Sequence, residues 1–545
     1  MENASTLPSD IQNSLGKSVI DQKLSKSPGK IAMIVFGCAI VGGIIYAGVK
    51  LGSDLATTHY PTAWPYILLG IALLIALGFE FVNGFHDTAN AVATVIYTHS
   101  LEPHVAVVWS GMWNLIGVLI SSGAVAFAVV SLLPVELILH VGSNAGFAMV
   151  FALLISAILW NLGTWWLGLP ASSSHTLIGS IIGVGLANQF LATKAGTGTG
   201  TSGVDWGQTV NVFKALLISP LVGFFLSALL LIIFKTFVKD KRLYEAPKGT
   251  EPPPFWIRGL LILTCTGVSF AHGSNDGQKG MGLIMLILIG TVPTAYALNH
   301  AIGANQTQDF VAVSQQAANT LQNYASPSGS VGDPRADITR YLQTKEIAPE
   351  TVAAEKQLIH EISHEVTLYK SLAGVPADQQ GNVRNDMYLA SEGLRVMGKT
   401  KAPAFSAADS KVLANYKKHL DGATKFIPGW VKLAVALALG LGTMVGWKRI
   451  VITVGEKIGK THLTYGQGAA AELVAMGTIL AADNFGLPVS TTHVLSSGVA
   501  GTMMANKSGL QWSTIRNIAM AWVFTLPAAA LLSGVLFMIF RTIAK

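Results

Sequence analysis

Long hydrophobic runs separated by polar segments dominate the chain. Runs of bilayer length with few or no charged residues lie at about 31–49, 66–85, 105–133, 147–167, 215–234, 281–299 and 518–540. Shorter apolar pieces lie near 176–192, 259–271, 433–447, 467–482 and 493–505. Because about twenty apolar residues span a bilayer as a helix, the pattern predicts an all-α polytopic membrane protein with roughly ten to twelve membrane segments. Several of these helices are expected to be broken.

Composition agrees with this prediction. Of the 545 residues, 51% are hydrophobic and only 12% are charged. The two cysteines, Cys38 and Cys265, both lie inside apolar runs, so neither a disulfide framework nor a thiolate metal site is expected. The formal net charge of +7 comes from basic residues in loops beside apolar runs, which favours an effect of membrane orientation over nucleic-acid binding.

The positions of the basic residues predict orientation. Four lysines lie between 17 and 30, ahead of the first run, whereas residues 51–65 contain no Lys or Arg. Basic clusters recur at 235–248 and 448–460. Since positive loops stay in the cytoplasm, the N-terminus and both clusters are expected there, and the span starting near 257 should begin inside.

One short phrase occurs twice in the chain. "GLPASSSHTL" at 168–177 and "GLPVSTTHVL" at 486–495 share six of ten positions. A polar stretch precedes each copy, "NGFHDTANA" at 83–91 and "HGSNDGQKG" at 272–280, and their spans are expected to enter from opposite faces. The order predicts an inverted repeat, an architecture typical of secondary transporters.

The second half is longer because a polar segment follows its first span. The resulting domain organisation has a polar cytoplasmic tail (1–30), an extra N-terminal membrane helix (31–50), a first transmembrane repeat (66–234), a basic cytoplasmic loop (235–256), the start of the second repeat (257–299), a soluble helical insertion expected in the cytoplasm (300–427), and the rest of the second repeat (428–545).

The repeated phrases have the composition of an oxyanion site. Pro170 and Pro488 suit the first turn of a helix, and the neighbouring hydroxyls suit capping. Two such helix starts within the membrane would face a substrate with positive dipole ends. The predicted substrate-binding residues are Ser172, Ser173, Ser174, Ser490, Thr491, Thr492, Asn90, Gln278 and Lys279. The alternative is that small residues here only permit close helix packing.

The polar stretches suggest ion coupling, because a carboxylate within a membrane usually marks an ion pathway or a proton relay. The predicted ion-coupling residues are Asp87, Asp276, Asn83, Asn275, His175 and His493. A carboxylate that caps a broken helix, and a histidine that only packs, are the alternatives. His86 and His272 are weaker candidates. Glu80, Glu472 and Asp483 rank lower because they do not occupy repeat-matched positions.

Four segments resemble the Pit-type inorganic phosphate transporter family. These are "GFHDTANAVATVIYT" at 84–98, "GLPASSSHTLIG" at 168–179, "FAHGSNDGQKG" at 270–280 and "GLPVSTTHVLSS" at 486–497. The resemblance implies symport of phosphate, in bacterial members commonly with protons and as a neutral metal-phosphate complex; other branches use sodium. It also implies that Asp87, Asn90 and Asp276 are essential and that the hydroxyls of both phrases line the site. The run at 31–49 departs from the usual bacterial pattern.

A symport is also expected on physical grounds. Moving one negative charge inward against about 100 mV costs roughly 2.3 kcal/mol, so phosphate needs accompanying cations. The sequence therefore predicts a multi-pass inner-membrane transporter rather than an enzyme, with no catalytic residues, no cofactor and no resident metal. The expected partners are inorganic phosphate, H⁺ or Na⁺, a divalent metal such as Mg²⁺ as part of the transported complex, and lipid. A homodimer is left open.

Three other interpretations remain at this stage. A divalent metal cation transporter would also use carboxylates and amides, a sulfate permease would also bind an oxyanion, and a membrane hydrolase of phosphate esters would use His and Ser differently. Within the insertion, "HEISH" at 360–364 matches a zinc-protease helix signature. No obvious third ligand follows, so an ordinary solvated helix is the expectation.

Overall fold

The computed structural model describes most of the chain. The described residues are 30–56, 58, 62–194, 203–247, 251–327 and 329–543, of which 30–33, 35–36, 87–90 and 304–305 are described in their backbone alone. Throughout these residues the regular structure is helical, apart from one isolated β-bridge between Gly459 and Leu510. The predicted N-terminal tail at 1–30 lies outside the described residues, except for the first residue of helix α3.

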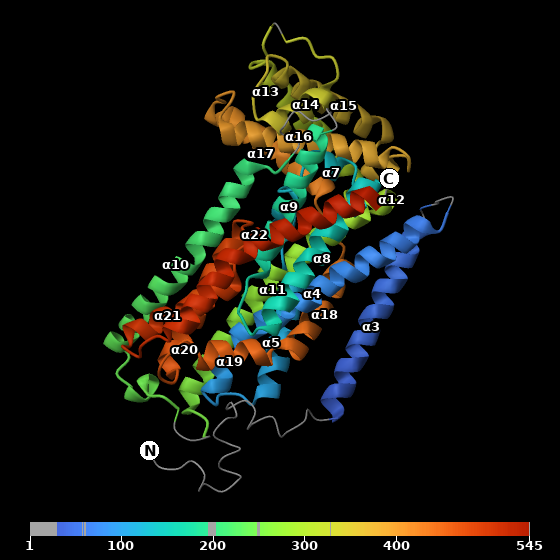
Figure 1. Ribbon diagram of the computed structural model, residues 1–545. Coiled ribbons are helices and arrows are strands. Elements are labelled where there is room, and N and C mark those ends of the chain that lie inside the picture. The colour runs from blue at the N-terminus through green and yellow to red at the C-terminus, as the bar shows by residue number, and fades with distance from the viewer. Residues whose placement is uncertain are drawn as a thin grey trace, which may run out of the picture.

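The membrane bundle accounts for most of the helices (Figure 1). They are α3 (Lys30–Leu55), α4 (Trp64–Tyr97), α5 (Pro103–Ile120), α6 (Ala124–Val130), α7 (Val135–Leu139), α8 (Asn144–Trp166), α9 (Ser173–Lys194), α10 (Trp206–Phe237), α11 (Phe255–Thr291), α18 (Gly429–Gly446), α19 (Lys448–Glu456), α20 (Tyr465–Asn484), α21 (Thr491–Ala505) and α22 (Trp512–Ile543). Within the described residues, 9 helices are long and apolar enough to cross a membrane. Large apolar side chains such as Ile218, Phe225 and Ile232 are exposed along α10, as a lipid-facing helix requires. The chain is a polytopic helical membrane protein.

The inserted segment forms a helical unit of its own at one end of the bundle (Figure 1). Its helices are α12 (Pro293–Tyr296), α13 (Ala304–Gln322), α14 (Pro334–Thr344), α15 (Thr351–Tyr369), η3 (Leu372–Gly374), α16 (Gln380–Thr400) and α17 (Ala407–Thr424). Leu358, Ile362, Met387 and Leu420 are among the fully buried residues of its separate hydrophobic core. The unit therefore packs around its own interior rather than around the membrane bundle.

The insertion and the basic loop after α10 lie at opposite ends of the bundle (Figure 1). Asp205, which precedes α10, pairs with Arg395 of the insertion at 3.1 Å, whereas Lys235, near the end of α10, donates to Asn506 at the far end. Helix η2 (Lys241–Tyr244) follows in the basic loop. A bundle-length helix separates the two segments, and this arrangement disagrees with the expectation that both face the cytoplasm; the side on which each lies stays a prediction.

The helices are broken at positions other than the polar stretches. Both stretches lie inside continuous helices, the first in α4 and the second in α11, which joins the apolar pieces expected at 259–271 and 281–299. The apolar run at 105–133 is instead split between α5 and α6 by Gly123, which has a positive φ of 87°. The interpretation of the aspartates as caps of broken helices is therefore wrong for Asp87 and Asp276.

Helices from the two predicted repeats pack on one another in exchanged pairs. Helix α4 contacts α18 so closely that a Cβ on Gly84 would lie 2.5 Å from the carbonyl oxygen of Leu439. Helix α11 contacts α5 in the same way, since a Cβ on Gly273 would lie 2.1 Å from the carbonyl oxygen of Asn114. Helix α9 likewise packs on α22, and α10 on α21. The inverted repeat stays a prediction, with which this exchange agrees.

Candidate functional site

Each Gly-Leu-Pro phrase links two helices and begins the second of them with a serine cap. Ser172 Oγ accepts from the backbone N–H of His175 at 3.2 Å at the start of α9. Ser490 Oγ accepts from the N–H of His493 at 3.1 Å at the start of α21. The prolines lie two residues before these caps, so the expectation that they stand in the first turn of a helix is wrong. The predicted capping role of the hydroxyls agrees with this geometry.

The two phrases are in direct contact. The hydroxyl of Ser174 donates to the backbone carbonyl of Val489 at 2.7 Å. The rings of His175 and His493 lie 4.5 Å apart, centroid to centroid, and His493 stacks on Trp522 at 4.0 Å. Trp522 lies ten residues into α22, about 15 Å from the beginning of that helix. The phrases therefore meet inside the bundle, as their repetition predicts for a shared site.

Helix α11 brings a buried ion pair to this meeting point. Lys279 Nζ lies 2.6 Å from Asp276 Oδ1 and donates to the hydroxyl of Ser174 at 2.5 Å. His272 Nε2 lies 3.3 Å from the other carboxylate oxygen of Asp276. Asp276 is 1% exposed and Lys279 0%, so both charges depend on each other rather than on water. Two predicted residues, one assigned to the substrate and one to the ion, are thus joined at one place.

A second polar group lies on the same helix. Gln278 donates to Asp483 Oδ1 at 2.6 Å and accepts from the backbone N–H of Val125 at 2.9 Å. Ser274 donates to the other oxygen of Asp483, also at 2.6 Å. Asp483 therefore contacts the same helix as the ion pair, although the sequence ranks it low because it does not occupy a repeat-matched position. Its place three residues before the second phrase was the available signal.

Glu80 is another carboxylate that repeat matching undervalued. Its Oε1 accepts from the backbone N–H of Gly280 at 2.7 Å, and Asn83 donates to its Oε2 at 3.3 Å. Glu80 and Asn83 are both fully buried. Since Gly280 follows Lys279, this contact fixes α4 against α11 beside the ion pair.

The remaining predicted residues have different positions. Asn275 donates to the carbonyl of Leu487 in the second phrase at 3.2 Å. Ser173, Thr491 and Thr492 are buried at the starts of α9 and α21. Asp87 and Asn90 lie in the helical backbone of α4, but their side chains are outside the described part of the chain. Two of the weaker candidates have other partners: His86 contacts the carbonyl of Asn161, and Glu472 contacts Thr264.

Metal-ligating side chains do not gather in the described residues. There, no group of three or more His, Cys, Asp or Glu side chains has a geometry that could hold a metal ion. In the "HEISH" segment, His360 and His364 are exposed, and Glu361 pairs with Arg335 at 2.8 Å. The two histidines thus lie on the exposed face of α15, whereas Ile362 between them packs into the core of the insertion.

Comparison with known proteins identifies the family of the chain. Residues 83–533 match the model of the phosphate transporter family. The chain belongs to this family. It is 43% identical over 491 residues to the low-affinity inorganic phosphate transporter PitA of Escherichia coli K12, covering 86% of this chain and 96% of that protein. PitB of the same organism is 41% identical over 493 residues, covering 87% and 96%. Both relatives are named as transporters, in keeping with the prediction that the chain is not an enzyme.

More distant relatives and a solved structure complete the comparison. A probable low-affinity inorganic phosphate transporter of Bacillus subtilis is 27% identical over 481 residues, covering 88% of this chain and 99% of that protein. A solved structure titled "The sodium-dependent phosphate transporter" has 18% sequence identity and a TM-score of 0.47, and covers 88% of this chain and 100% of its own.

Proposed function

We propose that the protein takes up inorganic phosphate across the inner membrane by cation-coupled symport. Membership of the phosphate transporter family and the names of the most similar relatives support phosphate as the substrate. The observation that carries the proposal is the contact between the two Gly-Leu-Pro phrases, where Ser174 bonds to Val489 beside the ion pair of Lys279. The favoured coupling ion is the proton, and phosphate travels as a neutral complex with a divalent metal such as Mg²⁺.

The proposed substrate site uses the starts of α9 and α21. Both helices direct the positive ends of their dipoles to the meeting point, a position suited to an oxyanion. The hydroxyl residues at the starts of these helices are all buried and would line the proposed site: Ser172, Ser173, Ser174, Ser490, Thr491 and Thr492. Lys279 adds a positive charge that Asp276 neutralises in this conformation. A phosphate oxygen would compete with Asp276 for Lys279, so binding would change the partner of that carboxylate.

The proposed coupling follows from this competition. A carboxylate released from Lys279 in a buried site is costly unless a cation joins it, and a proton is the smallest cation available. Asp276 is the described residue in this position, and Asp87 is its predicted counterpart in α4. Asn83 in α4 and Asn275 in α11 supply amide groups, and the His175–His493 contact connects the two phrases. Phosphate binding and proton uptake would therefore depend on one another.

Two alternatives use the same groups. In a sodium-coupled phosphate symporter the carboxylate and amide oxygens would hold Na⁺ in place of a proton. In a divalent cation transporter the metal would move without phosphate. H⁺ or Na⁺ as the coupling ion, a divalent metal as part of the transported complex, and a homodimer all belong to the proposal. Experiments must distinguish between the two coupling ions.

The direct test is uptake of labelled phosphate into proteoliposomes. Uptake is measured under an imposed proton gradient, with and without magnesium, and then with a sodium gradient in its place. Uptake that requires the proton gradient and rises with magnesium is the expected result. Uptake driven only by the sodium gradient would show that the coupling ion is Na⁺ rather than the proton. Metal uptake without phosphate uptake under either gradient would overturn the proposal.

A matched pair of substitutions tests the site itself. Ser174→Ala removes the hydroxyl that joins Lys279 to Val489, and phosphate uptake should fall at least about tenfold, the effect of one hydrogen bond to a charged group. Ser180→Ala is the control, because Ser180 lies in the same helix and its hydroxyl bonds to Ser156 and to the backbone carbonyl of Thr176, away from Lys279 and the second phrase. Equal loss in both variants would contradict a substrate role for Ser174.

A further inference from the structure

The end of the bundle that carries the insertion faces away from the cytoplasm. The membrane loops 51–65 and 121–143 at this end contain no Lys or Arg. Single basic residues occur in the last turns of α9 and α22, Lys194 and Arg541. The opposite end carries Lys235, Lys239, Lys241 and Arg242 around the end of α10. Because positive loops remain in the cytoplasm and long domains are translocated regardless of charge, the insertion lies on the side from which phosphate is taken up.

A narrow cavity separates the insertion from the membrane helices. We call it the junction cavity. One wall is apolar and belongs to α6 and α11, with Phe127, Met285 and Ile289. The other wall belongs to the insertion and includes Arg384, Lys425, Thr424, Tyr388 and Glu392. The cavity thus has an apolar floor towards the membrane and a polar roof with two cations and one carboxylate.

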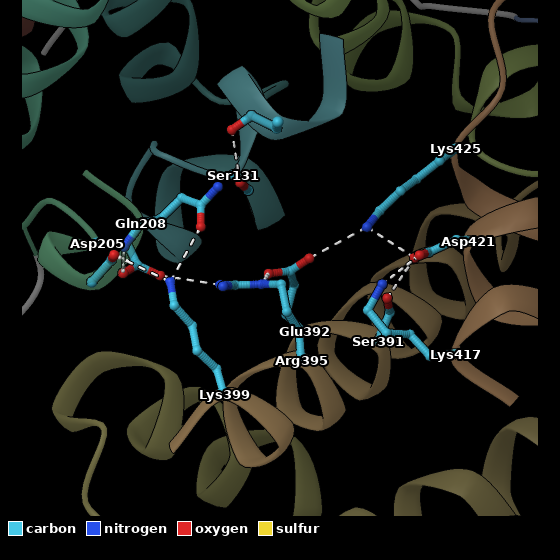
Figure 2. Close-up of polar contacts among 12 residues, drawn as sticks. Ser131, Asp205, Gln208, Ser391, Glu392, Arg395, Lys399, Lys417, Asp421 and Lys425 are labelled. Atoms are coloured by element: carbon cyan, nitrogen blue, oxygen red, sulfur yellow. Dashed lines mark hydrogen bonds and ion pairs between the residues drawn. The ribbon is translucent and has the colours of Figure 1, made fainter. Parts of the chain in front are cut away.

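The charges around this roof are connected in a network that Figure 2 shows. Glu392 accepts from Arg395 at 2.5 Å and pairs with Lys425 at 3.3 Å. Lys425 also contacts Asp421 at 2.8 Å, and Arg395 contacts Asp205 at 3.1 Å. Although burial alone would raise it, the pKa of Glu392 is held below its usual value by Lys425 and Arg395, so this carboxylate is charged. Lys425 is therefore shared between two carboxylates.

Arg384 is different, because it has no carboxylate partner among the described residues. It is 5% exposed, and its Nε–H lacks a hydrogen-bond partner in that part of the chain. Its guanidinium donates to Asn385 at 3.1 Å and lies over the ring of Tyr388, 4.9 Å from the centroid. A buried guanidinium without an anion is destabilising, and its planar donor set suits an oxyanion with two adjacent oxygens. Arg384 is thus an unneutralised cation in the wall of the cavity.

The junction cavity also lies close to the proposed substrate site. Gly282, in its wall, follows Lys279 in α11 by three residues, which is about 4.5 Å of helix rise. Helix α6, on the same wall, contacts the site through the bond between Val125 and Gln278. Along α11 the cavity wall therefore begins less than one helical turn from Lys279 and extends to Ile289, ten residues or about 15 Å of helix rise away.

We propose that the junction cavity is an outer oxyanion site, in which Arg384 and Lys425 hold phosphate before it reaches the central site. This inference rests on the proposed function. Phosphate takes up the unpaired donors of Arg384 and replaces one carboxylate on Lys425, while Glu392 keeps its bond to Arg395. The space open to the centre of a water molecule is only about 20 Å³ here, so the insertion moves away from α6 when the anion enters.

Sided uptake by the full-length protein tests this outer site. In right-side-out membrane vesicles, Arg384→Gln should raise the KM for phosphate about tenfold and leave the maximal rate unchanged, because the central site is intact. In inside-out vesicles the KM should not change. Arg340→Gln is the matched control, since Arg340 is an exposed arginine of the insertion that pairs with Asp337 and Glu350. A wild-type KM for Arg384→Gln in right-side-out vesicles would overturn the outer site.

A second variant covers the case in which Arg384→Gln does not fold. Lys425→Gln removes the other cation of the cavity and carries the same expectation of a raised KM on the insertion side alone. Lys425→Gln with an unchanged KM would then overturn the outer site. These outcomes are distinct from failure of the proposed function, in which the unaltered protein itself shows no phosphate uptake.

Discussion

The hydroxyl of Ser174 donates to the backbone carbonyl of Val489 at 2.7 Å, so the two copies of the repeated phrase touch although more than three hundred residues separate them. The same hydroxyl accepts from Lys279, which pairs with Asp276. One serine thereby connects the starts of two helices with a buried ion pair. Substrate binding at the helix starts would therefore directly change the ion pair of the Asp276 carboxylate with Lys279.

The ion pair of Asp276 and Lys279 should be required for transport as well as for stability of the fold. Asp276→Asn leaves Lys279 buried without a countercharge, so we expect a loss of stability of about 3–5 kcal/mol together with loss of uptake. Asp276→Asn with Lys279→Met removes both charges and should recover much of the stability but no coupled uptake. Thermal unfolding in detergent and proteoliposome uptake measure the two effects. Asp378→Asn, at an exposed site, is the control, and proton-coupled uptake by the double variant would refute a coupling role.

The close helix contacts at Gly84 and Gly273 leave no room for a methyl group. Gly84→Ala and Gly273→Ala would place a Cβ within 2.5 Å and 2.1 Å of carbonyl oxygens of α18 and α5. Both variants should lose thermal stability in detergent. Gly70→Ala and Gly259→Ala, in the same two helices, meet nothing within 4 Å and should be neutral or more stable by about 0.5–1 kcal/mol. Similar melting temperatures for both pairs of variants would contradict the described helix contacts.

The insertion should become less stable as the pH rises above about 4.3, the ordinary pKa of glutamate. Burial raises the pKa of Glu355 well above that value, and neither carboxylate oxygen has a hydrogen-bond partner among the described residues. The folded state therefore binds this proton more tightly than the unfolded chain does. The resulting stability is complete below the unfolded pKa and is lost as the pH rises through the folded pKa.

Hydrogen exchange of α15 between pH 4.5 and 8 measures this effect after correction for intrinsic exchange. Glu355→Gln should remove most of the pH dependence, whatever it does to the absolute protection. Glu346→Gln, at an exposed position, should leave it unchanged. An unaltered pH dependence in Glu355→Gln would assign the effect to another group.

The insertion and the basic loop should be labelled from opposite sides of the membrane. Single cysteines at the exposed positions Lys411 and Lys239 serve as probes in a chain without Cys38 and Cys265. A membrane-impermeant maleimide should label Lys411→Cys, and not Lys239→Cys, in right-side-out vesicles. The reverse result would place the insertion in the cytoplasm and remove the junction cavity from the uptake side.

The membrane helices could be predicted from sequence to a large extent. Apolar runs such as 147–167 and 518–540 correspond to α8 and α22, because hydrophobicity and helix length are local properties. The serine caps of α9 and α21 were predictable for the same reason. The continuity of α4 and α11 through their polar stretches was not, since long-range contacts such as that of Gln278 with Asp483 stabilise polar groups that the sequence alone presents as a break.

By itself the sequence determined that the chain is a helical membrane protein with a repeated phrase, because these features depend on neighbouring residues. Only the tertiary structure decided which distant groups meet. It brought Lys279 to Ser174, added Asp483 and Glu80 to the site, and placed the insertion opposite the basic loop. The physical reason is that buried polar groups must find partners, and which partner lies within reach depends on helix packing across the whole bundle.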